Sequence, residues 1–193
     1  YQKQFNLAVW QRELSANLQS SVAEFTNTNP AFQTVTTVLA KTAPMTIGKT
    51  LGDFAHTDLA EDISGLVAVF CSLFDRRQVG LRLSVLNKAQ CPRFHVDNVP
   101  CRLITTYLST ATQWLPDELV DRQKLGINSE GKPDQESGLY DSEEHIQSLR
   151  PGDVALCKGE LWPGNQNGGL VHRSPQVLHG QNRLLFSLDF SDE

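Results

Sequence analysis

Apolar residues near the start of the chain recur at helical spacing. Between Phe5 and Phe25 they are separated by three or four positions: Leu7, Trp10, Leu14, Leu18, Val22 and Phe25. This spacing places them on one stripe and predicts an amphipathic helix over this segment. The segment TNTNP at 26–30 ends the helix because Pro cannot continue it. A second helical pattern follows.

A further strong helix is predicted to begin at Asp58. Asp58 suits an N-cap, and Glu61 three residues later completes an approximate capping box. The basic pair Arg76-Arg77 suits the end of this helix. Its apolar face comprises Leu59, Ile63, Leu66, Val67, Phe70, Leu73 and Phe74.

After Gly80 the period changes to that of strands. Leu81, Leu83 and Val85 alternate with polar residues, and the segment CRLITTYL at 101–108 is rich in β-branched and aromatic residues. Further strands are predicted at Asp153–Cys157, Leu170–His172 and Arg183–Phe190. Helices followed by short, antiparallel-looking strands favour an α+β protein, a β-sandwich or barrel that carries a helical layer.

One long polar segment interrupts the strands. Residues 121–150 hold seven acidic and four basic side chains, with three Gly and one Pro. We expect a surface excursion, which could act as a lid.

Composition narrows the class of protein. The chain has 193 residues, a net charge of −5 and 39% hydrophobic residues, which is typical of a globular protein. No basic cluster is longer than Arg76-Arg77, which argues against nucleic-acid binding, and no apolar run approaches the roughly 18 residues of a membrane span. The four cysteines form no Cys-x-x-Cys pair, so disulfides are not expected. We therefore expect a cytoplasmic protein whose substrate is a small molecule or another protein.

The candidate chemistry begins at His95 and Asp97. Side chains two positions apart on an extended segment project to the same side, so both can face one ion. His172 lies 77 residues later, and Arg183 opens the next predicted strand. Two imidazoles and one carboxylate leave about three positions of an octahedral ion open, as in non-haem Fe(II) oxygenases. The triplet His56-Thr57-Asp58 has the same spacing, but there Asp58 is explained as a helix cap.

Three segments resemble a known superfamily in the same order. The segment HVDNVPCRLITTYLS at 95–109 resembles the His-x-Asp segment of Fe(II)/2-oxoglutarate dioxygenases of the prolyl-hydroxylase type. LRPGDVALCKG at 149–159 and HRSPQVLHGQNRLLFSLDF at 172–190 resemble two later strands of that superfamily. More closely, the whole chain resembles a bacterial family described as domain of unknown function 1826. The segment AVWQR near Trp10 and the two His segments carry that resemblance.

The resemblance implies a double-stranded β-helix (jelly-roll or cupin-like) core over residues 80–193, with residues 1–79 forming a helical layer packed on it. It further implies Fe(II) held by His95, Asp97 and His172, with Arg183 as the anchor for 2-oxoglutarate. Tyr107 either reaches this pocket or packs in the core, because strand parity alone does not decide its side.

Two departures from the superfamily pattern keep other functions open. Leu185 stands where a Ser commonly follows the anchor Arg, and Cys91 and Cys101 flank the His-x-Asp pair. A thiolate near the metal would favour Zn(II) over oxygen chemistry. The alternatives are a non-catalytic zinc protein involved in metal handling and a plain interaction domain.

Overall fold

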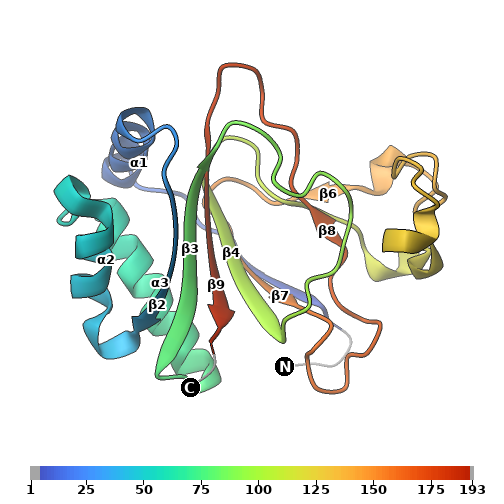
Figure 1. The fold of residues 1–193 in the computed structure, drawn as a ribbon, viewed down its shortest axis with the longest axis horizontal. Helices are drawn as coiled ribbons and strands as arrows, with labels where there is room; N and C mark the ends of the chain where they lie inside the picture. The colour runs from blue at the N-terminus through green and yellow to red at the C-terminus, as the bar shows by residue number, and fades with distance from the viewer. Residues whose placement is uncertain (1–4, 192–193) are drawn as a thin grey trace.

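The computed structural model describes residues 5–191, which form two antiparallel sheets and three α-helices (Figure 1). The larger sheet has the strand order β1-β7-β4-β9-β3-β2, and the smaller has the order β6-β5-β8. Every neighbouring pair of strands is antiparallel. The chain is therefore a mixed helix-and-sheet protein with antiparallel sheets, as the sequence predicted at this level.

The element bounds are as follows. The large sheet consists of β1 Leu7–Trp10, β2 Gln33–Leu39, β3 Gln78–Leu86, β4 Cys101–Leu108, β7 Val154–Lys158 and β9 Arg183–Phe190. The small sheet consists of β5 Gln113–Trp114, β6 Gln147–Ser148 and β8 His172–Arg173. The helices are α1 Ala16–Thr28, α2 Ala43–Leu51 and α3 Asp58–Phe74. Short 3-10 turns occur at Ala40–Thr42, Gly52–Phe54, Asp117–Leu119, Arg122–Lys124, Gly126–Ser129 and Glu143–His145.

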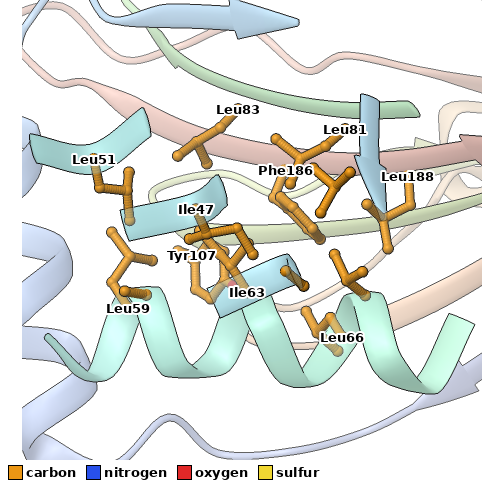
Figure 2. Packing of buried hydrophobic residues seen from close by; sticks show 14 of the residues in the cluster. Ile47, Leu51, Leu59, Ile63, Leu66, Leu81, Leu83, Tyr107, Phe186 and Leu188 are labelled. Carbon is orange, nitrogen blue, oxygen red and sulfur yellow. The ribbon is translucent and has the colours of Figure 1, made fainter. Parts of the chain in front are cut away.

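The three helices cover one face of the large sheet (Figure 1). Alternate residues of the strands point toward them, as the period of two requires. In Figure 2, Leu81, Phe186 and Leu188 from the strands meet Ile63 and Leu66 of α3. This is the main hydrophobic core of the molecule. The opposite face of the sheet is therefore left to other side chains.

The helix predicted from Phe5 is wrong in its first part. Residues 7–10 form strand β1, which pairs with β7 over its whole length. The helix begins only at Ala16, where the hydroxyl of Ser15 accepts a hydrogen bond from the N–H of Leu18. The apolar spacing from Leu7 to Leu14 resembled a helix, but pairing with a distant strand outweighs local pattern here.

The other helix predictions need two smaller corrections. The segment after Pro30 forms strand β2 before helix α2 begins at Ala43. Helix α3 does start where it was predicted, but its N-cap is Thr57, and Asp58 is its first residue. The predicted capping box does not form, because the hydroxyl of Thr57 donates to the carbonyl of Phe54 at 2.8 Å and makes no hydrogen bond to the first turn of the helix. The acidic residues of the first turn still suit the helix dipole.

The first 79 residues contribute more than a helical layer. Strands β1 and β2 lie at the two edges of the large sheet, and the four strands between them come from residues 78–190. The predicted strands at 101–108 and 183–190 are confirmed with their bounds. Among residues 5–191, no helix combines the length and the apolar character needed to cross a membrane.

Candidate metal centre

Part of the face of the large sheet that points away from the helices is polar, although Ile104 and Ala155 form an apolar cluster on it. Arg183, Ser187 and Asp189 alternate along β9 with the core residues Leu184, Phe186 and Leu188. Opposite them, Arg102 of β4 pairs in register with Asp189, and Arg82 of β3 pairs with Ser187. Residues that face each other across antiparallel strands lie on the same face. The sheet thus presents charged and hydroxyl groups on this side.

His95, Asp97 and His172 come together beside this face. One ligand atom of each residue lies within 4.8 Å of the others, and no other such group of His, Cys, Asp or Glu occurs within residues 5–191. The two histidines are held by reciprocal backbone hydrogen bonds, from each N–H to the other's carbonyl at 3.0 Å. Their ring centroids are 4.6 Å apart. The predicted convergence of three residues that are distant in sequence is what the fold produces.

Asp97 is positioned by a neighbouring glycine-rich loop. Its carbonyl accepts a hydrogen bond from the N–H of Glu160 at 2.9 Å. A Cβ at Gly159 would lie 2.0 Å from the carbonyl oxygen of Val99 and 2.7 Å from that of Asp97. Only glycine fits there, since the two backbones approach too closely for any side chain.

Both imidazoles are oriented by backbone carbonyls. Nδ1 of His95 lies 2.9 Å from the carbonyl oxygen of Arg93, and Nδ1 of His172 lies 3.0 Å from that of Leu170. A carbonyl only accepts, so each Nδ1 carries a proton in this arrangement, and in the neutral imidazole the lone pair lies on Nε2. Both Nε2 atoms lie near the carboxylate of Asp97. Nε2 of His95 is 3.7 Å from Oδ1, and Nε2 of His172 is 3.3 Å from Oδ2.

The electrostatics of the group favour a cation. Burial lowers the pKa of His95, and the neighbouring His172 lowers it further. Burial alone would raise the pKa of Asp97, but His172, Arg102 and His95 outweigh it and lower that pKa to about 2. Asp97 is therefore ionised and His95 favours its neutral form near pH 7. Acceptor atoms that face one another repel unless a positive ion lies between them.

A cavity of about 180 Å³ adjoins the three residues. Thr112 and Ser174 are among the residues that line it, and both also contact Arg183. The guanidinium of Arg183 donates to Ser174 Oγ at 3.0 Å, Thr112 Oγ1 at 3.0 Å and Thr106 Oγ1 at 3.1 Å. Arg183 is fully buried, and burial lowers its pKa to about 10. It therefore stays charged at pH 7.

Within the described residues, Arg183 has no ionic partner. Its Nε makes no hydrogen bond, and no carboxylate contributes to the shift of its pKa. A buried charge without a counterion is costly, because three hydroxyls replace only part of its hydration. An anion at this position would remove that cost.

The structure separates Tyr107 from this group. Its side chain lies in the core under the helices (Figure 2), and its hydroxyl donates to Asp62 Oδ2 at 2.6 Å. A register shift between Thr106 and Leu108 marks the strand at this point. Of the two positions considered for Tyr107, core packing is the one observed.

The two cysteines are also placed differently from the metal ligands. Cys91 lines the same cavity, but its thiol is not a member of the 4.8 Å group. Cys101 is buried in a separate cavity beside Leu156. Burial and the nearby Asp189 raise its pKa to about 12, which keeps it a neutral thiol.

Several residues of the site have no signal in the sequence motifs. Thr106, Thr112 and Ser174 supply the hydroxyls around Arg183. Leu185 lines the cavity. Strand parity could have found Thr106, which stands four positions after Arg102 on the same face. Thr112 and Ser174 lie outside the large sheet, so no local pattern marks them.

The excursion at 121–150 is docked against the site. Leu139 and Tyr140 form a second hydrophobic cluster with Phe94 and Val171, which directly precede His95 and His172. The buried carboxylate of Asp134 accepts a hydrogen bond from the N–H of Phe94 at 2.9 Å. This part of the chain supports the residues next to the two histidines in the observed structure.

Comparisons with known proteins identify the family of the chain and proteins of similar fold. A model of the family described as "Protein of unknown function (DUF1826)" matches residues 1–189. No functionally curated protein is significantly similar to the chain.

Three solved structures illustrate the similarity of fold. They are a dioxygenase for auxin oxidation from rice (TM-score 0.52, 10% identity, 97% of this chain and 74% of that chain), a prolyl-4-hydroxylase from Pseudomonas putida (0.50, 10%, 97% and 88%), and HygX from Streptomyces hygroscopicus with iron bound (0.51, 12%, 96% and 81%). At these identities the similarity shows the fold alone. The structural neighbours are of the class that the sequence motifs had suggested.

Proposed function

We propose that this chain, which belongs to the DUF1826 family, is an oxygenase-like protein that depends on Fe(II) and 2-oxoglutarate and is built on a double-stranded β-helix core. One observation carries the proposal. A fully buried guanidinium with no carboxylate partner among residues 5–191 lies next to a cavity that two imidazoles and one carboxylate line in ligand positions.

The donor set fits a divalent metal with open positions. His95, His172 and Asp97 would hold the ion through two neutral nitrogens and one oxygen, a combination found in non-haem Fe(II) oxygenases. When bound, the iron would supply the activation of oxygen for which such sites are used. In the neutral imidazoles, the hydrogen bonds to the backbone carbonyls of Arg93 and Leu170 place the proton on Nδ1, so Nε2 is the atom that can bind the metal.

Arg183 would hold the far carboxylate of 2-oxoglutarate. A guanidinium binds a carboxylate through two parallel hydrogen bonds, and this one has no competing anion among residues 5–191. The hydroxyls of Thr112 and Ser174 lie on the path between Arg183 and the cavity, where they can accept from Arg183 or donate to the bound acid. A cavity of about 180 Å³ suits a small dicarboxylate.

Two solved structures of one neighbour, HygX, add support by analogy of fold. HygX has been solved with iron bound and with nickel and 2-oxoglutarate bound. A zinc protein without catalysis would use the same three ligands, but it gives no role to the buried Arg183. Nor does any thiol join the 4.8 Å group. The observations therefore favour the oxygenase proposal over the zinc alternative, and the identity of the substrate is left open.

The test uses purified protein under anaerobic conditions. Adding Fe(II) and then 2-oxoglutarate should produce a weak visible charge-transfer band, which Arg183→Ala should greatly weaken. His95→Ala should abolish metal binding, whereas the matched control His56→Ala should leave it intact. Stoichiometric zinc in the protein as isolated, together with no band after iron loading, would refute the proposal.

A further inference from the structure

Arg102 connects the candidate metal ligands to the large sheet. Its Nε donates to Asp189 Oδ1 at 2.6 Å, and its Nη2 donates to Asp189 Oδ2 at 3.0 Å. The remaining nitrogen, Nη1, lies 2.7 Å from Oδ2 of Asp97. One guanidinium thus spans two carboxylates, of which only Asp97 belongs to the group around the metal position.

Asp189 determines where the guanidinium lies. The two residues face each other in register across β4 and β9, and their bidentate hydrogen bonds fix the plane of the arginine. The contact with Asp97 is an ion pair whose angle falls outside hydrogen-bond geometry. Arg102 is therefore held by Asp189 and presents a fixed positive charge to one oxygen of Asp97.

That charge makes the two oxygens of Asp97 unequal. Oδ2 faces Arg102 at 2.7 Å, whereas Oδ1 forms no ion pair with an arginine or a lysine among the described residues. A carboxylate with two free oxygens can bind a cation through both of them. Turning Oδ2 away from Arg102 would break a largely buried ion pair, which is unfavourable.

We propose that Arg102 is a positioning residue that makes Asp97 bind the metal through one oxygen only. The inference rests on the proposed function, because it concerns the same metal position. A carboxylate that chelated the metal would occupy two coordination positions. If Asp97 binds through one oxygen, one of those positions stays open. Lysine could not replace Arg102, since a single ammonium group cannot span both carboxylates with a bidentate contact.

The test counts the water molecules on bound Mn(II) by solvent proton relaxation. With three protein ligands on an octahedral ion, about three positions carry water. In Arg102→Gln, Asp97 is free to chelate, so the relaxivity of the bound ion should fall by about one third. Asp189→Asn, which loosens the guanidinium without touching Asp97, should lower it by a smaller amount.

Arg82→Gln is the matched control. Arg82 lines the same cavity and contacts Asp189 at 3.6 Å, but it makes no contact with Asp97. The relaxivity of Mn(II) bound to Arg82→Gln should equal that of Mn(II) bound to the unmodified protein. Unchanged relaxivity in both Arg102→Gln and Asp189→Asn at full Mn(II) occupancy would overturn the inference, as would an equal fall in Arg82→Gln.

Failure of the underlying site has a different signature. If His95→Ala still binds one Mn(II) with unchanged affinity, then the proposed metal position itself is wrong. If His95→Ala abolishes binding while the Arg102 and Asp189 variants behave like the unmodified protein, then only the role of Arg102 falls. If Arg102→Gln does not fold, the smaller fall expected in Asp189→Asn decides the question.

Discussion

We compare two arginines on opposite sides of the large sheet, the partly buried Arg12 and the fully buried Arg183, which have different partners. On the helix side, Arg12 meets Asp62 through two contacts, at 2.5 and 2.9 Å, and donates to the carbonyl of Gly152 at 2.7 Å. Tyr107 donates a further hydrogen bond to Asp62. On the other side, the hydrogen bonds of Arg183 within the described part of the chain all go to hydroxyl groups.

The pKa values of the two arginines express this difference. Burial lowers the pKa of both, but for Arg12 the hydrogen bonds and charge of Asp62 outweigh it, and the pKa is raised. For Arg183 nothing opposes burial, and the pKa falls to about 10. We interpret the ion pair of Arg12 as a contribution to stability, and the unpaired charge of Arg183 as a binding position for an anionic ligand. The predictions below test this contrast.

The largest effect is expected for Arg183→Met. Loss of the guanidinium should weaken 2-oxoglutarate binding to the metal-loaded protein by about 3 kcal/mol, or roughly a hundredfold, measured by isothermal titration calorimetry. The free energy of unfolding of the apoprotein should stay the same or rise, because the substitution removes a buried charge that has no counterion among the described residues. A marked loss of stability with unchanged 2-oxoglutarate binding would mean that Arg183 has a structural role and does not bind the ligand.

Arg12→Met should show the opposite pattern. It leaves the carboxylate of Asp62 without its ionic partner, which should cost about 3 kcal/mol of unfolding free energy in urea denaturation. The folded fraction should bind 2-oxoglutarate with unchanged affinity. If the folded fraction of Arg12→Met bound 2-oxoglutarate more weakly, then residues on the helix side of the sheet would contribute to the binding site.

Low pH should reduce the free energy of unfolding, because Asp97 becomes protonated. Its pKa of about 2 in the folded protein lies below the ordinary value of 3.8, so its contribution is fully present above pH 3.8 and is lost as the pH falls toward 2. That contribution is about 2 kcal/mol. Unfolding of the metal-free protein followed against pH should show it, and Asp97→Asn should lose this part of the pH dependence. An identical pH profile in both proteins would contradict the assignment.

The smallest effect is expected for Tyr107→Phe. Removing one hydrogen bond to Asp62 should lower the unfolding free energy by about 1 kcal/mol, because Arg12 still satisfies the carboxylate. Affinity for Mn(II) and for 2-oxoglutarate should stay the same. A loss of 2-oxoglutarate affinity would place Tyr107 in the pocket after all.

Local pattern was sufficient for a definite part of this protein. The bounds of β4 and β9 follow from alternation and β-branched residues, and the helical character of α3 follows from its apolar stripe. The same-side projection of His95 and Asp97 also follows from two-residue spacing. These features depend on neighbours within one turn or one strand, which the sequence displays directly.

The remaining features depend on pairings between distant segments. β1 is a strand because β7, more than 140 residues later, satisfies its backbone groups. The side on which Tyr107 lies was decided by sheet register and by the irregularity after Thr106. Whether a buried arginine finds a carboxylate or only hydroxyls is likewise settled when β4, β9 and the short strands assemble, since charge pairing at a few ångströms is a property of three-dimensional arrangement.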